Sequence, residues 1–175
     1  MPGTDLAIVA AVGFEGSYLW QLRQKIGNDL VLMPGARVLV FDDAERVLLI
    51  RRSDTGWWSM PAGAAEPDAS FARTAVRELE EETGLRADVA DLEAFGCVSD
   101  PERGMVTYPN GDQVRVFGLC FVAHVWSGVL EARDGEALEL DFFARHALPR
   151  PRHAQVEETL AMWDAYRKTG RFQAF

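Results

Sequence analysis

Cysteine is scarce in this 175-residue chain, which contains only Cys97 and Cys120, each within an apolar stretch. Two such residues do not suffice for a disulfide framework or a zinc site, so we expect reduced thiols in the core. Long apolar runs are absent as well, because residues 6–12 are too few to span a bilayer and follow Asp5 instead of basic residues. These absences predict a cytoplasmic protein without a membrane segment.

Positive charge is also in short supply, with 18 lysines and arginines against 27 aspartates and glutamates, which gives a net charge of −9. This balance disfavours binding to nucleic acid, because such binding depends on neutralising phosphates. An anionic substrate would therefore need a cation at the site. The chain does have 48% apolar and 26% charged residues, which is the composition of a soluble globular protein, and its length suits one domain.

Hydrophobic periodicity and turn residues predict a series of strands and helices. Helices are predicted at residues 18–26, at residues 70–82 and after Pro151. Strands are predicted at residues 37–41, 47–50, 92–98, 105–108, 114–126 and 138–143, and residues 6–12 are strand-like in composition. The first two predicted strands should pair antiparallel across the polar turn 42–45. Asn110-Gly111 should join a hairpin whose second arm, apolar on both faces, is central in the sheet.

Acidic residues concentrate in the predicted helix at residues 70–82 and just beyond it. At about 100° per residue, Glu78, Glu81 and Glu82 gather beside an apolar stripe, whereas Glu80 points elsewhere. Like charges three and four residues apart destabilise a helix unless a cation neutralises them. Oxygen ligands alone favour Mg²⁺ or Mn²⁺ over zinc. A solvated helix end is the alternative interpretation of the glutamate run by itself.

The spacing of the surrounding residues favours the metal. The pattern G-x5-E-x7-R-E-U-x-E-E-x-G-U, with U aliphatic, is the Nudix box, and eight of its nine fixed positions match. They are Gly63, Arg77, Glu78, Leu79, Glu81, Glu82, Gly84 and Leu85. The segment before the box, Trp58-Ser59-Met60-Pro61, is similar to the family's as well. The chain therefore resembles a Nudix hydrolase over roughly residues 35–148.

The resemblance implies a set of metal ligands and a catalytic base. Glu78, Glu81 and Glu82 would hold the divalent metal together with the carbonyl of Ala62. Glu81 or Glu82 would accept the proton of the attacking water. A further acid often comes from a later loop, where Glu136 and Glu139 are the best candidates and Glu131 is a third.

Two positions depart from the family pattern. The box glutamate expected at position 69 is Ala69, and the glycine that commonly precedes Gly63 is Ala62. The missing glutamate tends to pair with the box arginine in the family, so we expect Arg77 to pair with Glu66 or Asp68 instead. An alanine carbonyl can bind metal as well as a glycine carbonyl can.

Four residues near the box are candidates for substrate binding. The Arg52 guanidinium could grip phosphate, Trp57 could stack on a base, and the turn that begins at Tyr108 could cover the site. Gly63 belongs to the same loop as the metal carbonyl. Ordinary roles as surface arginine, core aromatic and turn residue are the alternatives. We expect His124 to be a core histidine and residues 150–153 to be a solvated linker.

The family resemblance implies an α/β (α+β) fold, an α/β/α sandwich with a mixed sheet. The expected organisation is an N-terminal extension at residues 1–34 that is a candidate dimer contact, a Nudix domain at 35–148, and a C-terminal helix within 149–175 packed on that domain. Homodimers are common among relatives. The partner would be a nucleotide-type small molecule, with no nucleic acid and no membrane.

The implied reaction is cleavage of a phosphoanhydride in a nucleoside diphosphate linked to another group, with Mg²⁺ or Mn²⁺ screening the diphosphate. Pro101 lies 16 residues after Leu85, a spacing common in ADP-ribose-cleaving members, so ADP-ribose or a nucleotide sugar ranks first. A turn-forming role for Pro101 is the alternative. Two other functions stay open, namely hydrolysis of oxidised nucleoside triphosphates and nucleotide binding without cleavage.

Overall fold

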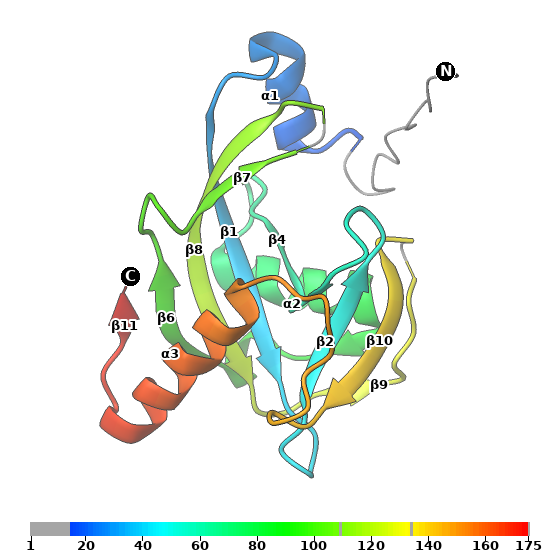
Figure 1. The fold of residues 1–175 in the computed structure, drawn as a ribbon, viewed down its shortest axis with the longest axis vertical. Coiled ribbons are helices and arrows are strands. Elements are labelled where there is room, and N and C mark those ends of the chain that lie inside the picture. The colour runs from blue at the N-terminus through cyan, green and yellow to red at the C-terminus, as the bar shows by residue number, and fades with distance from the viewer. Residues whose placement is uncertain (1–14, 109, 134, 175) are drawn as a thin grey trace.

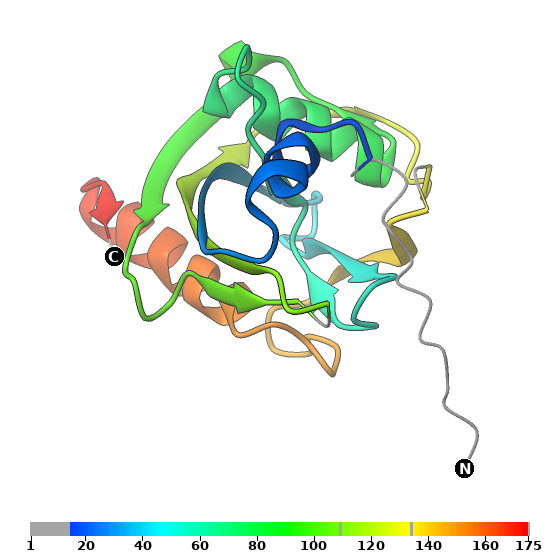
Figure 2. The same ribbon diagram turned by 90° about the horizontal axis from the view of Figure 1, so that it is seen from above.

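The computed structural model describes residues 15–108, 110–133 and 135–174. Helices α2 (Phe71–Thr83) and α3 (Gln155–Thr169) lie on opposite sides of the strands, so the chain forms three layers (Figures 1 and 2). This arrangement is the α/β/α sandwich that the sequence predicts. The strand-like run at residues 6–12 lies outside the described residues.

The larger sheet has the strand order β11-β6-β8-β1-β4, with β7 also paired to β8. Its strands are β1 (Val31–Val40), β4 (Ala62–Ala64), β6 (Leu92–Val98), β7 (Met105–Thr107), β8 (Gln113–Ala123) and β11 (Gln173–Ala174). β8 runs parallel to β1 but antiparallel to β6 and β7, which confirms a mixed sheet, a central β8 and the hairpin at Asn110-Gly111. The sequence does not predict β11, because two residues are too few to show alternation.

The predicted antiparallel pairing of residues 37–41 with residues 47–50 is wrong, except next to the turn that joins the two segments. Only Phe41 and Val47 form a bridge, after which the two strands enter different sheets. β2 (Val47–Arg52) pairs instead with β10 (Ala137–Phe143) on one edge and β3 (Trp58–Ser59) on the other. The backbone groups of β2 that pair with β10 and β3 are not free to pair with β1. A separate ribbon joins β5 (Leu85–Arg86) to β9 (Ser127–Gly128), and a 3₁₀ turn, η1 (Val89–Asp91), precedes β6.

The apolar core has two halves, one on each face of the larger sheet. Leu39, Phe95 and Trp163 are among the buried residues of the half beneath α3. Ala75 and Leu79 of α2 pack into the other half. Full burial of a large apolar side chain contributes roughly 1.5–3 kcal/mol, so the apolar stripe of α2 fixes the rotation of that helix. The glutamates beside the stripe are thereby directed toward the strands.

Both ends of α2 are defined by local capping interactions. Ser70 is the N-cap, and its hydroxyl oxygen accepts a hydrogen bond from the backbone N–H of Arg73 at 3.2 Å. Gly84 ends the helix with φ of 74°, in the left-handed region, and its N–H donates to the carbonyl of Glu80. The helix position therefore follows from local signals as well as from packing.

Helix α1 (Tyr18–Ile26) is held on the β7–β8 hairpin by the buried side chain of Arg23. Its guanidinium donates to the carbonyls of Gly27 at 2.9 Å and Gln113 at 2.6 Å, and it lies 3.5 Å from the Asp112 carboxylate. These partners satisfy a charge that would otherwise be costly to bury. The helix forms where the sequence predicts it and lies at the same end of the molecule as β7 (Figure 1).

His124 is exposed, and the expectation that it is a core histidine is wrong. β8 ends at Ala123, three residues earlier than the predicted strand, so the imidazole leaves the core and lies 2.7 Å from a carboxylate oxygen of Glu93. Glu93 also accepts a hydrogen bond from the hydroxyl of Tyr166. Cys120 is buried and Cys97 is half-buried, and both are free thiols.

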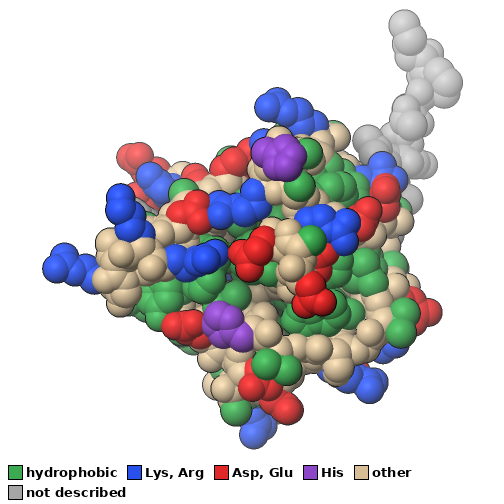
Figure 3. Space-filling model, turned by 90° about the horizontal axis from the view of Figure 1, so that it is seen from below, with side chains coloured by type: hydrophobic (Ala, Val, Ile, Leu, Met, Phe, Trp, Pro, Cys, Tyr) green, Lys and Arg blue, Asp and Glu red, His purple; other side chains and the backbone are tan. Residues whose placement is uncertain are grey.

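Charged side chains of both signs are interspersed over the face seen from below (Figure 3). Several surface charges form ion pairs, such as Arg145 with Asp164 at 2.6 Å. Exposed pairs of this kind contribute at most about 1 kcal/mol each, so the core carries the stability of the fold. Among the described residues, no helix has the length and apolar character needed to cross a membrane.

Candidate active site

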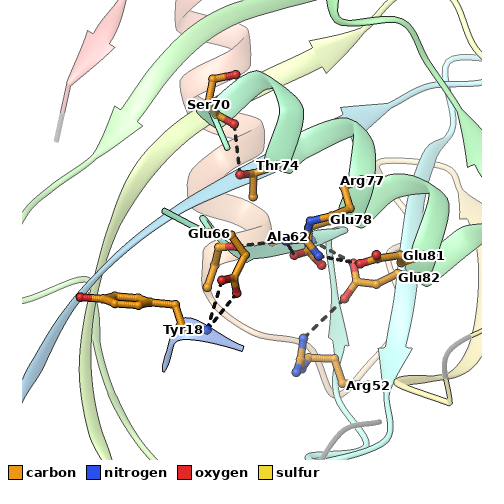
Figure 4. A network of polar contacts seen from close by, with 11 residues as sticks. Tyr18, Arg52, Ala62, Glu66, Ser70, Thr74, Arg77, Glu78, Glu81 and Glu82 are labelled. Carbon is orange, nitrogen blue, oxygen red and sulfur yellow. Dashed lines mark hydrogen bonds and ion pairs between the residues drawn. The ribbon is translucent and has the colours of Figure 1, made fainter. Parts of the chain in front are cut away.

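Two of the three predicted metal ligands are buried where α2 faces the loop around β4 (Figure 4). Glu82 is 1% exposed and Glu78 is 9% exposed, whereas half of the Glu81 side chain is exposed. The Oε2 atom of Glu82 accepts a hydrogen bond from the backbone N–H of Ala62 at 3.0 Å. Its Oε1 atom has no hydrogen-bond partner among the residues that the structure describes, and it lies 3.8 Å from Nη1 of Arg52. A buried carboxylate oxygen without a donor is costly, which indicates that it serves a ligand.

Arg77 pairs with the carboxylates of its own helix, so the expectation that it pairs with Glu66 or Asp68 is wrong. Its Nη1 atom donates to Glu81 at 2.6 Å, and its Nη2 atom donates to Glu78 at 2.5 Å and to the carbonyl of Ala64 at 3.1 Å. Glu81 lies one turn from Arg77, so this pair needs no long-range ordering. The Glu66 carboxylate instead accepts the N–H of Tyr18 at the start of α1, at 3.1 Å and 3.3 Å.

Gly63 makes room for the Glu78 carboxylate. A Cβ atom at position 63 would lie 2.0 Å from the carboxyl carbon of Glu78, well inside van der Waals contact. A glycine therefore allows the buried carboxylate to lie against the β4 backbone. This observation assigns Gly63 a role in placing Glu78, alongside the substrate contact expected from the sequence.

The electrostatic environment favours protons on both buried glutamates. Burial raises the pKa of Glu78 to about 7, with Glu81 and Glu136 adding to the rise and Arg77 opposing it. Burial likewise raises the pKa of Glu82 well above its usual range, with Glu78 adding to the rise and Arg52 opposing it. A bound cation would reverse this preference, because it stabilises the ionised carboxylates.

Of the later acids, Glu136 acts electrostatically on the buried glutamates, whereas the other two each pair with an arginine. Glu136 raises the pKa of both Glu78 and Glu82, which places its charge within electrostatic reach of the pair. Glu139 lies opposite Arg51 in the β2–β10 register and is 3.3 Å from its guanidinium. Glu131 pairs with Arg133 at 3.1 Å.

The predicted substrate residues Arg52 and Tyr108 are neighbours, and Asp54 joins them. Arg52 donates to both oxygens of Asp54, at 3.0 Å and 2.9 Å. Burial raises the pKa of Tyr108, and the charge of Arg52 opposes that rise. The strand β2 thus ends beside Glu82, with its last residue linking the carboxylates to the β7–β8 hairpin. Asp54 is not among the site residues predicted from the sequence. Its position two residues after Arg52 could have indicated this ion pair.

Trp57 is 45% exposed and lies beside His153, with ring centroids 5.3 Å apart, whereas Trp58 is buried against Phe143. The prediction that residues 150–153 form a solvated linker is therefore wrong for His153, and it is wrong for Arg152 as well, whose side chain is 15% exposed and donates to Glu157 and to the carbonyl of Pro149. The backbone N–H of His153 donates to the carbonyl of Trp58 at 2.9 Å, and its Nε2 atom lies 3.3 Å from the Thr55 hydroxyl. No local pattern signals this contact, because the paired residues are almost a hundred positions apart.

The carboxylates fit a divalent cation chemically but are not assembled around one. Every side-chain donor is oxygen, Glu82 Oε1 is unpartnered, and Gly63 leaves the Glu78 carboxylate its space. Within the described part of the chain, no group of three or more His, Cys, Asp and Glu side chains forms a ready ligand set. Arg77 contacts one oxygen of each carboxylate, Oε1 of Glu78 and Oε2 of Glu81, so each of them keeps its second oxygen for a cation.

Comparison with known proteins agrees with this geometry. The NUDIX domain model matches residues 31–163. An ADP-ribose pyrophosphatase from Methanocaldococcus jannaschii is 32% identical over 114 residues, covering 63% of this chain and 62% of that protein. An RNA pyrophosphohydrolase from Pseudomonas putida is 35% identical over 75 residues, which is 43% of each chain. The chain spans only 36%, 62% and 56% of the length of three of its curated relatives.

Solved structures share the fold at low sequence identity. The crystal structure of a MutT NUDIX hydrolase from Burkholderia pseudomallei superposes with a TM-score of 0.58 and 24% identity, covering 75% of this chain and 98% of that one. This likeness concerns the architecture alone. Because the family model spans most of the chain and the carboxylates lie together beside β4, the chain belongs to the NUDIX domain family.

Proposed function

We propose that this protein is a Mg²⁺- or Mn²⁺-dependent pyrophosphohydrolase that cleaves a phosphoanhydride in a nucleoside diphosphate linked to another group. The unpartnered Oε1 atom of Glu82, buried beside Glu78, carries this proposal. Two adjacent buried carboxylates destabilise a fold unless a ligand compensates them. A non-catalytic nucleotide-binding protein has no need for this arrangement.

The residues around the pair have distinct roles in this proposal. Glu78, Glu81 and Glu82 hold the cation together with the carbonyl of Ala62, and Glu136 adds a further acid. When bound, the cation stabilises negative charge on the phosphoryl oxygens and makes water more acidic. Glu81 or Glu82 accepts the proton of the attacking water.

The substrate lies toward Arg52, Trp57 and Tyr108 in this proposal. Arg52 balances phosphate charge, and the exposed Trp57 ring offers a surface for a base. We rank ADP-ribose or a nucleotide sugar first, because a relative that matches 63% of the chain is named ADP-ribose pyrophosphatase. Pro101 adds no contact to this ranking, because it is exposed in a turn in which the Asp100 carbonyl accepts the N–H of Gly104 at 3.1 Å.

A substrate panel tests the proposal. The purified chain is incubated with Mg²⁺ or Mn²⁺ and with ADP-ribose, nucleotide sugars, dinucleoside polyphosphates or nucleoside triphosphates, and the products are identified. We expect a nucleoside monophosphate and a sugar phosphate from the first two classes. A kcat/KM for any nucleoside triphosphate tenfold above that for ADP-ribose and the nucleotide sugars would overturn the ranking.

Matched variants of α2 test the catalytic assignment. Glu81→Gln and Glu82→Gln should each lower kcat by at least about 100-fold while the fold survives. Glu80→Gln is the control, because Glu80 is on the same helix but pairs outward with Arg86 at 2.6 Å. Wild-type turnover in Glu81→Gln or Glu82→Gln would refute the assignment, as would nucleotide binding without any product.

A further inference from the structure

A cavity of about 730 Å³ lies along α2 on the flank that carries Arg77 and Glu81. It is open to solvent, and four arginines line it together with Glu80 and Glu81. The arginines come from three segments, namely α2, β5 and the loop after β9, and they are Arg73, Arg77, Arg86 and Arg133. A chain with a net charge of −9 and only 18 basic residues thus gathers four of them around one cavity.

Three of these arginines pair with carboxylates, and the fourth does not. Arg86 pairs with Glu80 at 2.6 Å, Arg77 with Glu81 at 2.6 Å, and Arg133 with Glu131 at 3.1 Å. Among the residues that the structure describes, no carboxylate lies within 4.0 Å of the Arg73 guanidinium, and this side chain forms no hydrogen bond. The cavity therefore holds at least one guanidinium whose charge is compensated by solvent alone.

Ala69 explains why this cavity exists. It lines the cavity at the position where the box pattern has glutamate, four residues before Arg73. A glutamate there would occupy part of the space and add a carboxylate to the same cavity that Arg73 lines. With alanine at position 69, the space stays open and Arg73 stays without a counter-ion. Val76 and Ala87 form the apolar part of the cavity lining.

We propose that this cavity is an anion site that binds a phosphate group. Guanidinium groups bind phosphate oxygens through paired, charge-assisted hydrogen bonds, and several converging arginines favour a dianion over chloride. Arg77 belongs both to this cavity and to the carboxylate cluster, so a bound phosphate competes with Glu81 for its Nη1 atom. Phosphate binding would thereby favour the release of Glu81 from Arg77.

Binding measured without metal tests this site separately from catalysis. The metal-free full chain is titrated with inorganic phosphate at constant ionic strength, and binding is followed by calorimetry and by ³¹P NMR. We expect one saturable site with a Kd on the order of 1 mM, because the arginines are partly exposed and screened. AMP and ribose 5-phosphate identify the source, since tighter binding of either shows that the phosphate is carried by a larger molecule. The result is independent of whether any substrate is hydrolysed.

Variants outside the catalytic cluster make the assignment specific. Arg73→Gln combined with Arg133→Gln should weaken phosphate binding at least fivefold, and Ala69→Glu should do the same with no loss of thermal stability. Arg171→Gln is the control, because it removes the charge of an exposed arginine far along the chain, for which no ion pair is found among the described residues. Equal weakening in the control, unchanged binding in the double variant or no saturable binding would each overturn the proposal.

Discussion

Raising the pH in the absence of metal should destabilise the fold through Glu78. Its pKa is about 7 in the folded protein against 4.5 for an ordinary glutamate, so between these values the folded state binds more protons than the unfolded state. Stability is therefore highest below about pH 4.5 with respect to this group, and it falls as the pH rises through about 7. Glu82 acts in the same direction, because its pKa is raised as well.

The magnitude follows from the shift. Each pH unit in this window costs up to about 1.4 kcal/mol per group, so Glu78 alone accounts for at most about 3 kcal/mol between pH 4.5 and pH 7. That is a large part of the roughly 5–15 kcal/mol that stabilises a typical domain. The carboxylates with lowered pKa values, such as Asp54 and Asp164, lose their stabilising effect only on acidification below their unfolded pKa. These aspartates therefore do not contribute to the change in stability between pH 4.5 and pH 7.

Urea unfolding at pH 5, 6, 7 and 8 in the presence of a chelator measures the effect. The free energy of unfolding of the wild type should fall across this range, and Glu78→Gln should remove a large part of the fall, because a neutral amide does not titrate. Glu80→Gln should keep the wild-type slope, and saturating Mg²⁺ should flatten it. If Glu78→Gln and the wild type have the same slope, the proposed environment of Glu78 is wrong.

Four further predictions concern the close contacts around β4, the box departure and the cation. Gly63→Ala should cost only about 1 kcal/mol, because the clash is with the movable Glu78 carboxylate, but should lower hydrolysis at least about tenfold. Gly35→Ala should cost about 1–3 kcal/mol, because its Cβ would lie 2.7 Å from the Gly63 carbonyl oxygen, and comparison of urea midpoints and kcat/KM checks both. Ala69→Glu should add up to about 1 kcal/mol by supplying a carboxylate to the arginines that line the same cavity, without altering substrate ranking, and a less stable variant in thermal unfolding would contradict this. A chelator should abolish hydrolysis and Mg²⁺ or Mn²⁺ should restore it, whereas turnover that persists in the chelator would exclude the metal.

Some features of the protein are local enough to be determined by the sequence itself. The capping Ser70, the left-handed Gly84 and the i, i+3, i+4 spacing of the glutamates fix α2 and the side on which its carboxylates lie. Asn110-Gly111 specifies the hairpin for a similar reason, because the turn conformation depends on adjacent residues. The candidate metal ligands could therefore be predicted without coordinates.

Other features depend on which distant segments pack together, and only the tertiary structure decides them. β2 pairs with β10 and β3 instead of β1, and the Glu66 carboxylate accepts the N–H of Tyr18 at the start of α1 instead of pairing with Arg77. His153 reaches Trp57 through a contact between segments almost a hundred residues apart. Burial, which raises the pKa of Glu78, is likewise a property of the packed layers, because a glutamate on an isolated helix is solvated.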